Sequence, residues 1–183
     1  MARLIVLNGP PGVGKSTLAR RYVDDHPFAL DVDLDSIRRL LGRWQDDVAQ
    51  ATLLARRLTL AMARDHLCSG SDVVLPQYLG RAEFLREAES VAMEAGAEFH
   101  EFVLSDSRDE IVRRFNERTA RSIDPAHVAA AELIASLGGD DALFTICDRV
   151  LLLAAARPGA HVIPCPDGAI DAVYAEIIRL VES

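Results

Sequence analysis

The sequence predicts a three-layer α/β sandwich around a five-stranded parallel sheet, and three observations carry that prediction. Short apolar runs alternate with longer segments of helical periodicity along the chain, which is the pattern of repeated strand–helix–strand units. A glycine-rich loop separates the first apolar run from the first helical segment. The chain has 183 residues, of which 50% are hydrophobic, enough for one well-buried domain. We therefore expect a single domain over residues 1–183.

The expected elements follow from this alternation. The expected strands are residues 3–8, 28–32, 72–76, 98–104 and 160–164. The expected helices are residues 15–25, 35–42, 46–69, 81–95, 107–120, 124–136, 140–156 and 168–182. Within the helix over 46–69, helical spacing predicts a packing stripe made of Val48, Leu54, Leu58, Ala61 and Met62. Ser107 and Glu110 fit a capping box, and Asp124 before Pro125 fits an N-cap and first helical position.

The glycine-rich loop reads GPPGVGKST over residues 9–17 and fits the phosphate-binding motif G-x-x-x-x-G-K-[ST] at every fixed position. Glycines let successive backbone N–H groups point at phosphate oxygens, and the following helix adds its positive dipole end. Lys15, the only lysine in the chain, supplies a charge for the outer phosphates, and Ser16 offers a hydroxyl to Mg²⁺. The predicted nucleotide contacts are Gly9, Gly12, Val13, Gly14, Lys15, Ser16 and Thr17.

An acidic cluster follows the second expected strand. Asp31 and the candidate pair Asp33 and Asp35 stand at alternate positions, and Arg38 lies three residues beyond Asp35, on the same helical face. A phosphotransferase needs a carboxylate to orient or deprotonate the attacking hydroxyl and a group to hold Mg²⁺. The alternative interpretation is that one of the two carboxylates only caps the helix and that Arg38 is a surface charge.

Composition limits the classes of partner. The formal net charge is −8, which disfavours nucleic acid as a partner, because such proteins rely on a broad basic footprint. The three cysteines are far apart and have no C-x-x-C spacing, so we expect neither a disulfide framework nor a zinc site. We see no signal peptide or membrane-span pattern and expect a cytoplasmic protein, either monomer or homodimer.

The glycine loop followed by D-x-D-x-x-R over residues 33–38 resembles the small P-loop kinases. That group includes the 5′-kinase domain of phage polynucleotide kinase, gluconate kinase, chloramphenicol phosphotransferase and the zeta toxins. The resemblance implies a P-loop nucleoside-kinase-like fold with a short helical lid at about residues 117–125. It also implies ATP, Mg²⁺ and transfer of the γ-phosphate to a hydroxyl of a small molecule, such as a nucleoside, a sugar or an antibiotic.

By position, the resemblance places the general base on Asp35 and acceptor binding on Arg38. Asp33 would lie near the metal, although in some relatives the corresponding carboxylate is the base, so both assignments stay open. The third expected strand ends without an acid, since Asp72 stands at its start. Metal binding would therefore fall on Ser16 and the acidic cluster.

Further site residues are expected on the acceptor side. Trp44, Gln77 and Tyr78 are candidate acceptor contacts, although Trp44 could equally be a packing residue.

Arginines are expected to close the site. Arg113, Arg114 and Arg121 each have an acid four residues earlier, whereas Arg118 follows Arg114, a like charge. In the resembled kinases, lid arginines offset the charge of the transferring phosphate, which favours Arg118 first and Arg121 second. Arg157, before the last strand, is a candidate for adenine binding or part of a simple turn.

Other functions remain open at this point. The spacing of Asp35 and Arg38 also fits a polynucleotide 5′-hydroxyl kinase, against which the net charge argues. A zeta-like sugar-nucleotide kinase fits the same motifs. A protein of another class, an ATP-binding regulatory switch that phosphorylates no acceptor, would need the glycine loop alone.

Overall fold

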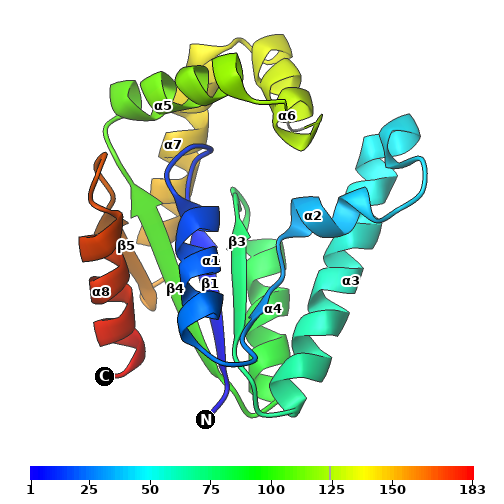
Figure 1. The fold of residues 1–183 in the computed structure, drawn as a ribbon, viewed down its shortest axis with the longest axis vertical. Coiled ribbons are helices and arrows are strands. Elements are labelled where there is room, and N and C mark those ends of the chain that lie inside the picture. The colour runs from blue at the N-terminus through cyan, green and yellow to red at the C-terminus, as the bar shows by residue number, and fades with distance from the viewer. Residues whose placement is uncertain (124) are drawn as a thin grey trace.

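One sheet of five parallel strands, in the order β2-β3-β1-β4-β5, forms the centre of the molecule, with helices on both faces (Figure 1). The computed structural model describes residues 1–123 and 125–183, and for residues 125 and 126 the backbone alone. The strands are β1 (Arg3–Asn8), β2 (Leu30–Asp31), β3 (Val73–Gln77), β4 (Glu98–Ser105) and β5 (Ala160–Pro164). The helices are α1 (Lys15–Asp25), α2 (Leu34–Arg39), the 3-10 helix η1 (Trp44–Asp47), α3 (Val48–Cys68), α4 (Ala82–Glu94), α5 (Arg108–Arg121), α6 (Pro125–Ser136), α7 (Asp140–Ala155) and α8 (Ile170–Val181).

The central strand β1 shows how the three layers are held together. Its side chains alternate between the two faces of the sheet, as in any strand. Leu4 and Val6 belong to the hydrophobic core under α3 and α4, whereas Ile5 and Leu7 belong to the core under α1 and α8. Because both faces are covered, β1 is a continuous apolar run, as expected for a buried parallel strand. The predicted α/β sandwich is confirmed.

The sequence placed most elements correctly, and the largest error concerns β2. We expected a strand over residues 28–32, but β2 contains only Leu30–Asp31. Phe28 has a φ of 65° and a side chain that is 85% exposed. A left-handed backbone at a bulky residue interrupts an extended strand, so pairing with β3 begins only at Leu30.

The helix expected over residues 46–69 begins differently and packs through another face. Its first turn is the separate 3-10 helix η1, and Asp47 then caps α3 by accepting from the amide of Gln50 at 2.9 Å. The expected packing stripe is wrong, because Val48, Leu54, Leu58 and Met62 are 37–46% exposed and Ala61 is also exposed. The residues that pack inward are Ala51, Ala55, Thr59, Ala63 and Leu67. Small side chains at spacings of four let α3 approach its neighbours closely, while its larger apolar residues face outward.

One of the two predicted helix caps can be tested. Ser107 caps α5 by accepting from the amide of Glu110 at 3.3 Å. The other half of the capping box is missing, because the Glu110 carboxylate pairs with Arg113 and the amide of Ser107 donates to Asp106. The cap expected at Asp124 lies outside the described residues.

The polar edge of the sheet lies where the carboxyl ends of the strands meet the glycine loop. In an open parallel sheet, ligands bind beyond this edge. Helices α5 and α6 lie above it, while α2 and the start of α3 stand beside it (Figure 1). The segment expected to act as a lid, residues 117–125, runs from the last turns of α5 into the start of α6.

Candidate functional site: a phosphate loop facing a carboxylate and an arginine

The loop over residues 9–17 connects β1 to α1 in a conformation that glycine is needed to form. Gly9, Gly12 and Gly14 have φ angles of 153°, 84° and 111°, values that residues with a Cβ rarely adopt. A Cβ on Gly9 would also lie 2.7 Å from the carbonyl oxygen of Leu104. The backbone N–H groups of such a loop, together with the N-terminus of α1, form an anion-binding concavity.

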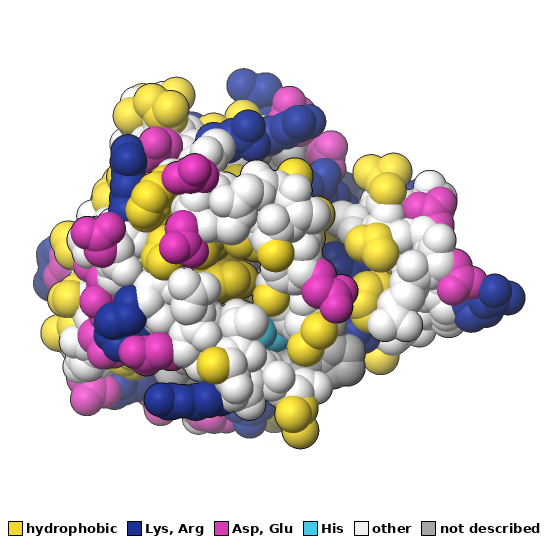
Figure 2. Space-filling model, turned by 90° about the horizontal axis from the view of Figure 1, so that it is seen from above, with side chains coloured by type: hydrophobic (Ala, Val, Ile, Leu, Met, Phe, Trp, Pro, Cys, Tyr) yellow, Lys and Arg dark blue, Asp and Glu magenta, His cyan; other side chains and the backbone are white. Residues whose placement is uncertain are grey.

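A cleft of about 970 Å³ opens over this loop and the first turns of α1. Its lining residues are Gly12, Gly14, Lys15, Ser16, Thr17, Arg20, Arg21, Asp24, Asp25, Arg114 and Arg118. Seen from above, a crevice separates the main body from the smaller lobe that carries α2 and η1, and basic side chains lie inside it (Figure 2). Five of the seven loop residues predicted to contact a nucleotide line this cleft, whereas Gly9 and Val13 do not. Asp33, Asp35 and Arg38 are also not among its lining residues.

Lys15 lies at the centre of the charged groups in the site. Its Nζ donates hydrogen bonds to the carbonyl oxygens of Gly9 at 2.9 Å and Pro10 at 2.8 Å. Burial lowers the pKa of Lys15 to about 8, Asp35 and Asp33 act to raise it, and Arg118 acts to lower it further. An ammonium that is costly to bury gains most from an incoming anion. The predicted group of one lysine, two aspartates and one arginine is thus brought together.

The two candidate carboxylates have different environments. Asp33 is the N-cap of α2, where one oxygen accepts from the amide of Asp35 at 3.1 Å and the other from the hydroxyl of Ser36 at 2.6 Å. The capping alternative therefore applies to Asp33. Asp35 pairs with Arg38 at 3.1 Å, and its side chain is 44% exposed. Burial raises the pKa of Asp35, Arg38 and Lys15 act to lower it, and Asp33 acts to raise it. Asp35 is the carboxylate with capacity to accept a proton.

Arg38 is fixed from several sides on the wall opposite the loop. Its Nη1 donates to the hydroxyl of Thr52 at 3.4 Å, and its guanidinium carbon lies 5.1 Å from the centre of the Trp44 ring. The side chain is 13% exposed, and its Nε is buried without a hydrogen-bond partner. A held guanidinium with a spare donor suits recognition of a polar acceptor. Trp44 is therefore brought to the site, as a partner of Arg38.

The two residues predicted after the third strand are placed differently from each other. Gln77 ends β3 at the polar edge and stands in register with Asn8. Tyr78 packs against a cluster that contains Val150 on α7. Burial raises the pKa of Tyr78, and the charge of Arg149 acts to lower it. The described contacts bring Tyr78 to α7 and not to Asp35.

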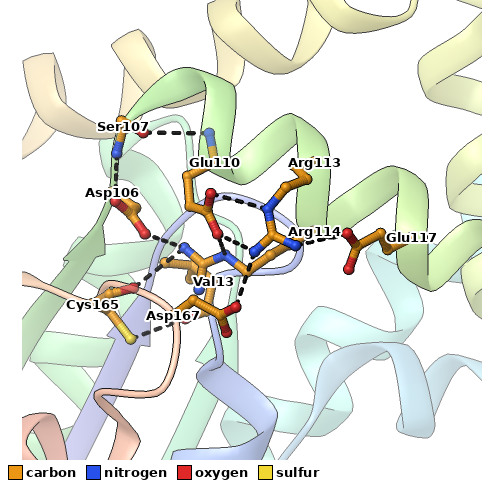
Figure 3. A network of polar contacts seen from close by, with 9 residues as sticks. All are labelled: Val13, Asp106, Ser107, Glu110, Arg113, Arg114, Glu117, Cys165 and Asp167. Carbon is orange, nitrogen blue, oxygen red and sulfur yellow. Dashed lines mark hydrogen bonds and ion pairs between the residues drawn. The ribbon is translucent and has the colours of Figure 1, made fainter.

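The arginines of α5 separate into paired and unpaired ones. Arg113 binds Glu110, Glu117 and Asp167, and Arg114 binds Asp106 (Figure 3). The ion pair expected between Glu117 and Arg121 is not found among the described residues, because Glu117 binds Arg113 at 2.7 Å. Arg118 lines the cleft, whereas Arg121 does not. Within the described residues, the side chain of Arg118 has no hydrogen bond or ion pair, so its charge is available to an anion.

Arg157 is not brought to this site, which corrects its predicted role beside adenine. Its Nε contacts Glu101 at 2.5 Å and its Nη2 contacts Glu89 at 3.0 Å. Glu101 is 1% exposed, and a buried carboxylate needs a cation beside it. Arg157 also precedes β5, whereas Cys165 follows it. The Sγ of Cys165 donates to the carbonyl oxygen of Val13 in the glycine loop at 3.1 Å, so the loop lies at the end of β5 opposite Arg157. These contacts show that Arg157 is the ion-pair partner of the buried carboxylate of Glu101.

Asn8 is a site residue that the sequence reasoning missed. It is fully buried at the end of β1, where its Oδ1 accepts from the amides of Gly9 and Leu79, both at 2.8 Å. Its Nδ2 donates to the carbonyl oxygen of Leu79 at 3.0 Å. Asn8 thus ties the start of the glycine loop to the segment after β3. A polar residue that ends an apolar strand was the available signal, because buried amides require partners.

Asp31, at the end of β2, belongs to the predicted acidic cluster but was given no role of its own, and it bears on magnesium. Its Oδ1 is buried without a hydrogen-bond partner, and burial, then Asp33, raises its pKa to about 6. Among the described residues, no group of three or more His, Cys, Asp or Glu side chains could hold a metal by itself. Mg²⁺ commonly binds through one or two protein groups, several waters and substrate phosphates. An orphaned carboxylate oxygen beside Asp33, together with the Ser16 hydroxyl, fits such an ion.

Comparison with known proteins agrees with this geometry. A family model described as "AAA domain" matches residues 4–138, which includes the glycine loop, the acidic cluster and the arginines of α5. No curated protein matches the sequence. Among the described residues, no helix is long and apolar enough to cross a membrane.

Several solved structures share the fold. APS kinase from Mycobacterium tuberculosis, in complex with AMPPNP and APS, is 22% identical with a TM-score of 0.65, over 100% of this chain and 98% of that one. A gluconokinase from Sinorhizobium meliloti 1021 is 16% identical with a TM-score of 0.61, over 97% and 93%. The tunicamycin resistance protein of Deinococcus radiodurans is 16% identical with a TM-score of 0.62, over 99% and 96%.

Proposed function

We propose that this chain, which belongs to the AAA domain family and has the fold of small P-loop kinases, transfers the γ-phosphate of ATP to a hydroxyl group of a small molecule. One arrangement carries the proposal: Arg118 lines the same cleft as Lys15 of the phosphate loop, and Asp35 and Asp33 lie near enough to Lys15 to act on its charge. A nucleotide-binding site needs only the loop. A loop that faces both a carboxylate and an unpaired arginine has the parts for phosphoryl transfer.

Each residue of the site then has a role in the reaction. The loop amides and Lys15 bind the β- and γ-phosphates, and an anion there replaces the carbonyl contacts that Lys15 now makes. Asp35 accepts the proton of the acceptor hydroxyl as its oxygen attacks the γ-phosphorus. The bond to phosphorus forms as the bond to the bridging oxygen of ADP breaks, and Arg118 offsets the charge on the transferring group. Arg121 is the second candidate for that role.

Magnesium would be held by Ser16 and, through water, by the carboxylates of Asp33 and Asp31. When bound, Mg²⁺ would neutralise part of the charge on the β- and γ-phosphates. Asp33 also has the task of capping α2, which places Asp35 and Arg38 on the first turns of that helix. Arg38, with Trp44 against it, would orient the acceptor.

The structural neighbours support this class of reaction through their ligands and names. The related APS kinase structure holds AMPPNP and APS together, and another neighbour is a gluconokinase. Both names denote kinases of small molecules. A small-molecule acceptor also agrees with the net charge of −8, since a nucleic-acid strand favours a basic surface with stacked aromatic residues.

A transfer experiment with labelled nucleotide tests the proposal. The purified chain is incubated with Mg²⁺, ATP or GTP labelled at the γ-phosphate, and a panel of nucleosides, sugars, aminoglycosides and a 5′-hydroxyl oligonucleotide. We expect label in one class of small molecule, with little transfer when Mg²⁺ is removed. Salt-sensitive labelling of the oligonucleotide would support the polynucleotide kinase instead. Binding of ATP without labelling of any compound would contradict the proposal and favour a regulatory switch.

A further inference from the structure

Helix α5 carries Arg118, and Arg114 anchors that helix one turn earlier. Arg114 forms an ion pair with Asp106, and each side chain is 14% exposed. The same guanidinium donates to the carbonyl oxygen of Cys165 at 3.2 Å. Figure 3 shows both partners converging on Arg114 from below α5. Asp106 follows the last residue of β4, and Cys165 follows the last residue of β5. Arg114 therefore joins α5 to the ends of two strands.

The same contacts continue into the phosphate loop. The Sγ of Cys165 donates to the carbonyl oxygen of Val13 at 3.1 Å, and its amide donates to Ser105 at 2.7 Å. The backbone of α5 also lies directly on the loop, because a Cβ on Gly12 would be 3.5 Å from the amide nitrogen of Phe115. One connected set of contacts thus fixes the distance between α5 and the loop.

Arg118 depends on this anchor for its position. It lies one helical turn beyond Arg114, about 6 Å along the axis, and its side chain has no hydrogen bond or ion pair within the described residues. It nevertheless acts electrostatically on Lys15 across the cleft. Because no hydrogen bond or ion pair holds the Arg118 side chain, its place over the loop is set by the direction of α5. That direction is set by the buried face of α5, which includes Ile111 and Phe115, together with the pair between Arg114 and Asp106.

A second ion pair from the same helix gives a natural comparison. Arg113 contacts Asp167 at 2.9 Å, but these side chains are 43% and 68% exposed. Exposed pairs contribute little to structure, whereas breaking a buried pair leaves an uncompensated charge behind. Loss of Arg114 should therefore disturb the position of α5 more than loss of Arg113.

We propose that Arg114 is a positioning residue that, by binding Asp106 and the carbonyl of Cys165, holds Arg118 where it meets the terminal phosphate of a bound nucleotide. The proposal rests on the proposed function for the role of Arg118. Nucleotide binding alone is enough to test it. A residue that contacts the γ-phosphate strengthens the binding of ATP but not that of ADP, which has no γ-phosphate. Arg114 would affect the preference for ATP over ADP by holding Arg118 in place.

The test is a double-mutant cycle on the ratio of ADP to ATP dissociation constants, measured calorimetrically on the full chain with Mg²⁺. Arg118→Ala should reduce the preference for ATP by about tenfold, the loss of one charge-assisted contact. Arg114→Met should reduce it by a similar factor, and the double variant should lose no more than Arg118→Ala alone. Arg113→Met, the matched control, should keep the ratio of the unmodified chain within about twofold.

Several results would overturn the proposal. One is an Arg114→Met variant that keeps the full preference for ATP. Another is a double variant whose loss is the product of the two single losses, because Arg114 would then contact the nucleotide independently. If Arg114→Met does not fold, Asp106→Asn breaks the same pair and should give the same ratio. Failure of the kinase itself would appear separately, as ATP binding with the expected ratios but no transfer to any acceptor.

Discussion

The two walls of the crevice in Figure 2 are built in different ways. The nucleotide wall joins the glycine loop, the ends of β4 and β5 and the base of α5 through buried contacts, including the pair between Arg114 and Asp106. The acceptor wall consists of a two-residue strand, a six-residue helix and a 3-10 turn. Two buried side chains of α2, Leu34 and Ile37, attach it to the core. The polar contacts that order it are the cap made by Asp33 and the contacts of Arg38.

This difference has a functional meaning. A P-loop requires a fixed geometry, because its amides and lysine must meet the same phosphates in every reaction. Acceptor sites are the part of a fold in which substrate choice varies, and they are often built from short segments on a rigid scaffold. The nucleotide wall should therefore respond to substitution through both stability and activity, and the acceptor wall mainly through activity.

The largest expected effect is on the nucleotide wall, at Lys15. Lys15→Met should lower phosphoryl transfer by about 10²–10³-fold, because it removes the main cation facing the terminal phosphates. It should leave the unfolding temperature unchanged or raised, since burial of the ammonium is costly and lowers the pKa of Lys15 to about 8. Steady-state kinetics and thermal unfolding measure the two effects. Arg64→Met serves as the control, because Arg64 forms an exposed ion pair with Glu94 and does not line the cleft.

Two glycines compare the walls directly. Gly9→Ala should lower the free energy of unfolding by about 2–4 kcal/mol, because a Cβ would meet the Leu104 carbonyl at 2.7 Å where φ is 153°. At Gly42, beside α2, a Cβ would have no neighbouring atom within 4 Å, so Gly42→Ala should change stability by less than about 1 kcal/mol. Urea unfolding measures both. Equal losses would remove the contrast between the walls.

The cap of α2 should have a smaller effect on stability. Asp33→Asn keeps a side-chain oxygen for the amide of Asp35 but removes the charge, so we expect a loss of up to about 1 kcal/mol in the free energy of unfolding. Urea denaturation gives this value. A loss of several kcal/mol would mean that the acceptor wall is held as firmly as the nucleotide wall.

Proton uptake is the most subtle expected effect. With a pKa of about 8, Lys15 is roughly three-quarters neutral at pH 8.5 and almost fully charged at pH 6.5. Phosphates favour the charged form, so ATP binding should take up about three-quarters of a proton at pH 8.5 and almost none at pH 6.5. Calorimetry in buffers of different ionisation enthalpy measures this uptake. Uptake that is equal at both pH values would contradict the assignment.

The same pKa has a consequence for folding. Because the pKa of Lys15 is lower in the folded state than its ordinary value of 10.5, the unfolded chain binds more protons between these two values. The free energy of unfolding should therefore rise with pH from about 8 to 10.5 as far as Lys15 is concerned. Below pH 8 the cost of the buried charge is fully present.

The nucleotide wall could be predicted from the sequence because its motif is local. A complete G-x-x-x-x-G-K-[ST] after an apolar run specifies the strand, the loop and the helix together. The grouping of Lys15, Asp35 and Arg118 was implied by the resemblance to the small P-loop kinases, and it agrees with the rule that ligands bind at the carboxyl ends of parallel strands. The same rule speaks against the adenine role predicted for Arg157, which stands before β5 at the opposite end.

Other features could not be predicted from the chain because they depend on tertiary partners. Periodicity shows that α3 is amphipathic, but it cannot tell whether the alanines or the leucines face the sheet. The roles of Asn8 and Asp31 depend on burial that only the folded chain defines. The capping role of Asp33 depends on α2 starting at Leu34, a boundary that propensity places to within a few residues.

The most direct test of the proposed transfer site is the rate of phosphoryl transfer by Asp35→Asn in a single turnover, with ATP affinity measured alongside. Asp46→Asn serves as the control, because Asp46 forms an exposed pair with Arg43 on the same wall. We predict that Asp35→Asn slows transfer by about 10²–10⁴-fold while ATP affinity stays within about threefold. Transfer by Asp35→Asn at the rate of the unmodified chain would contradict the role assigned to this carboxylate.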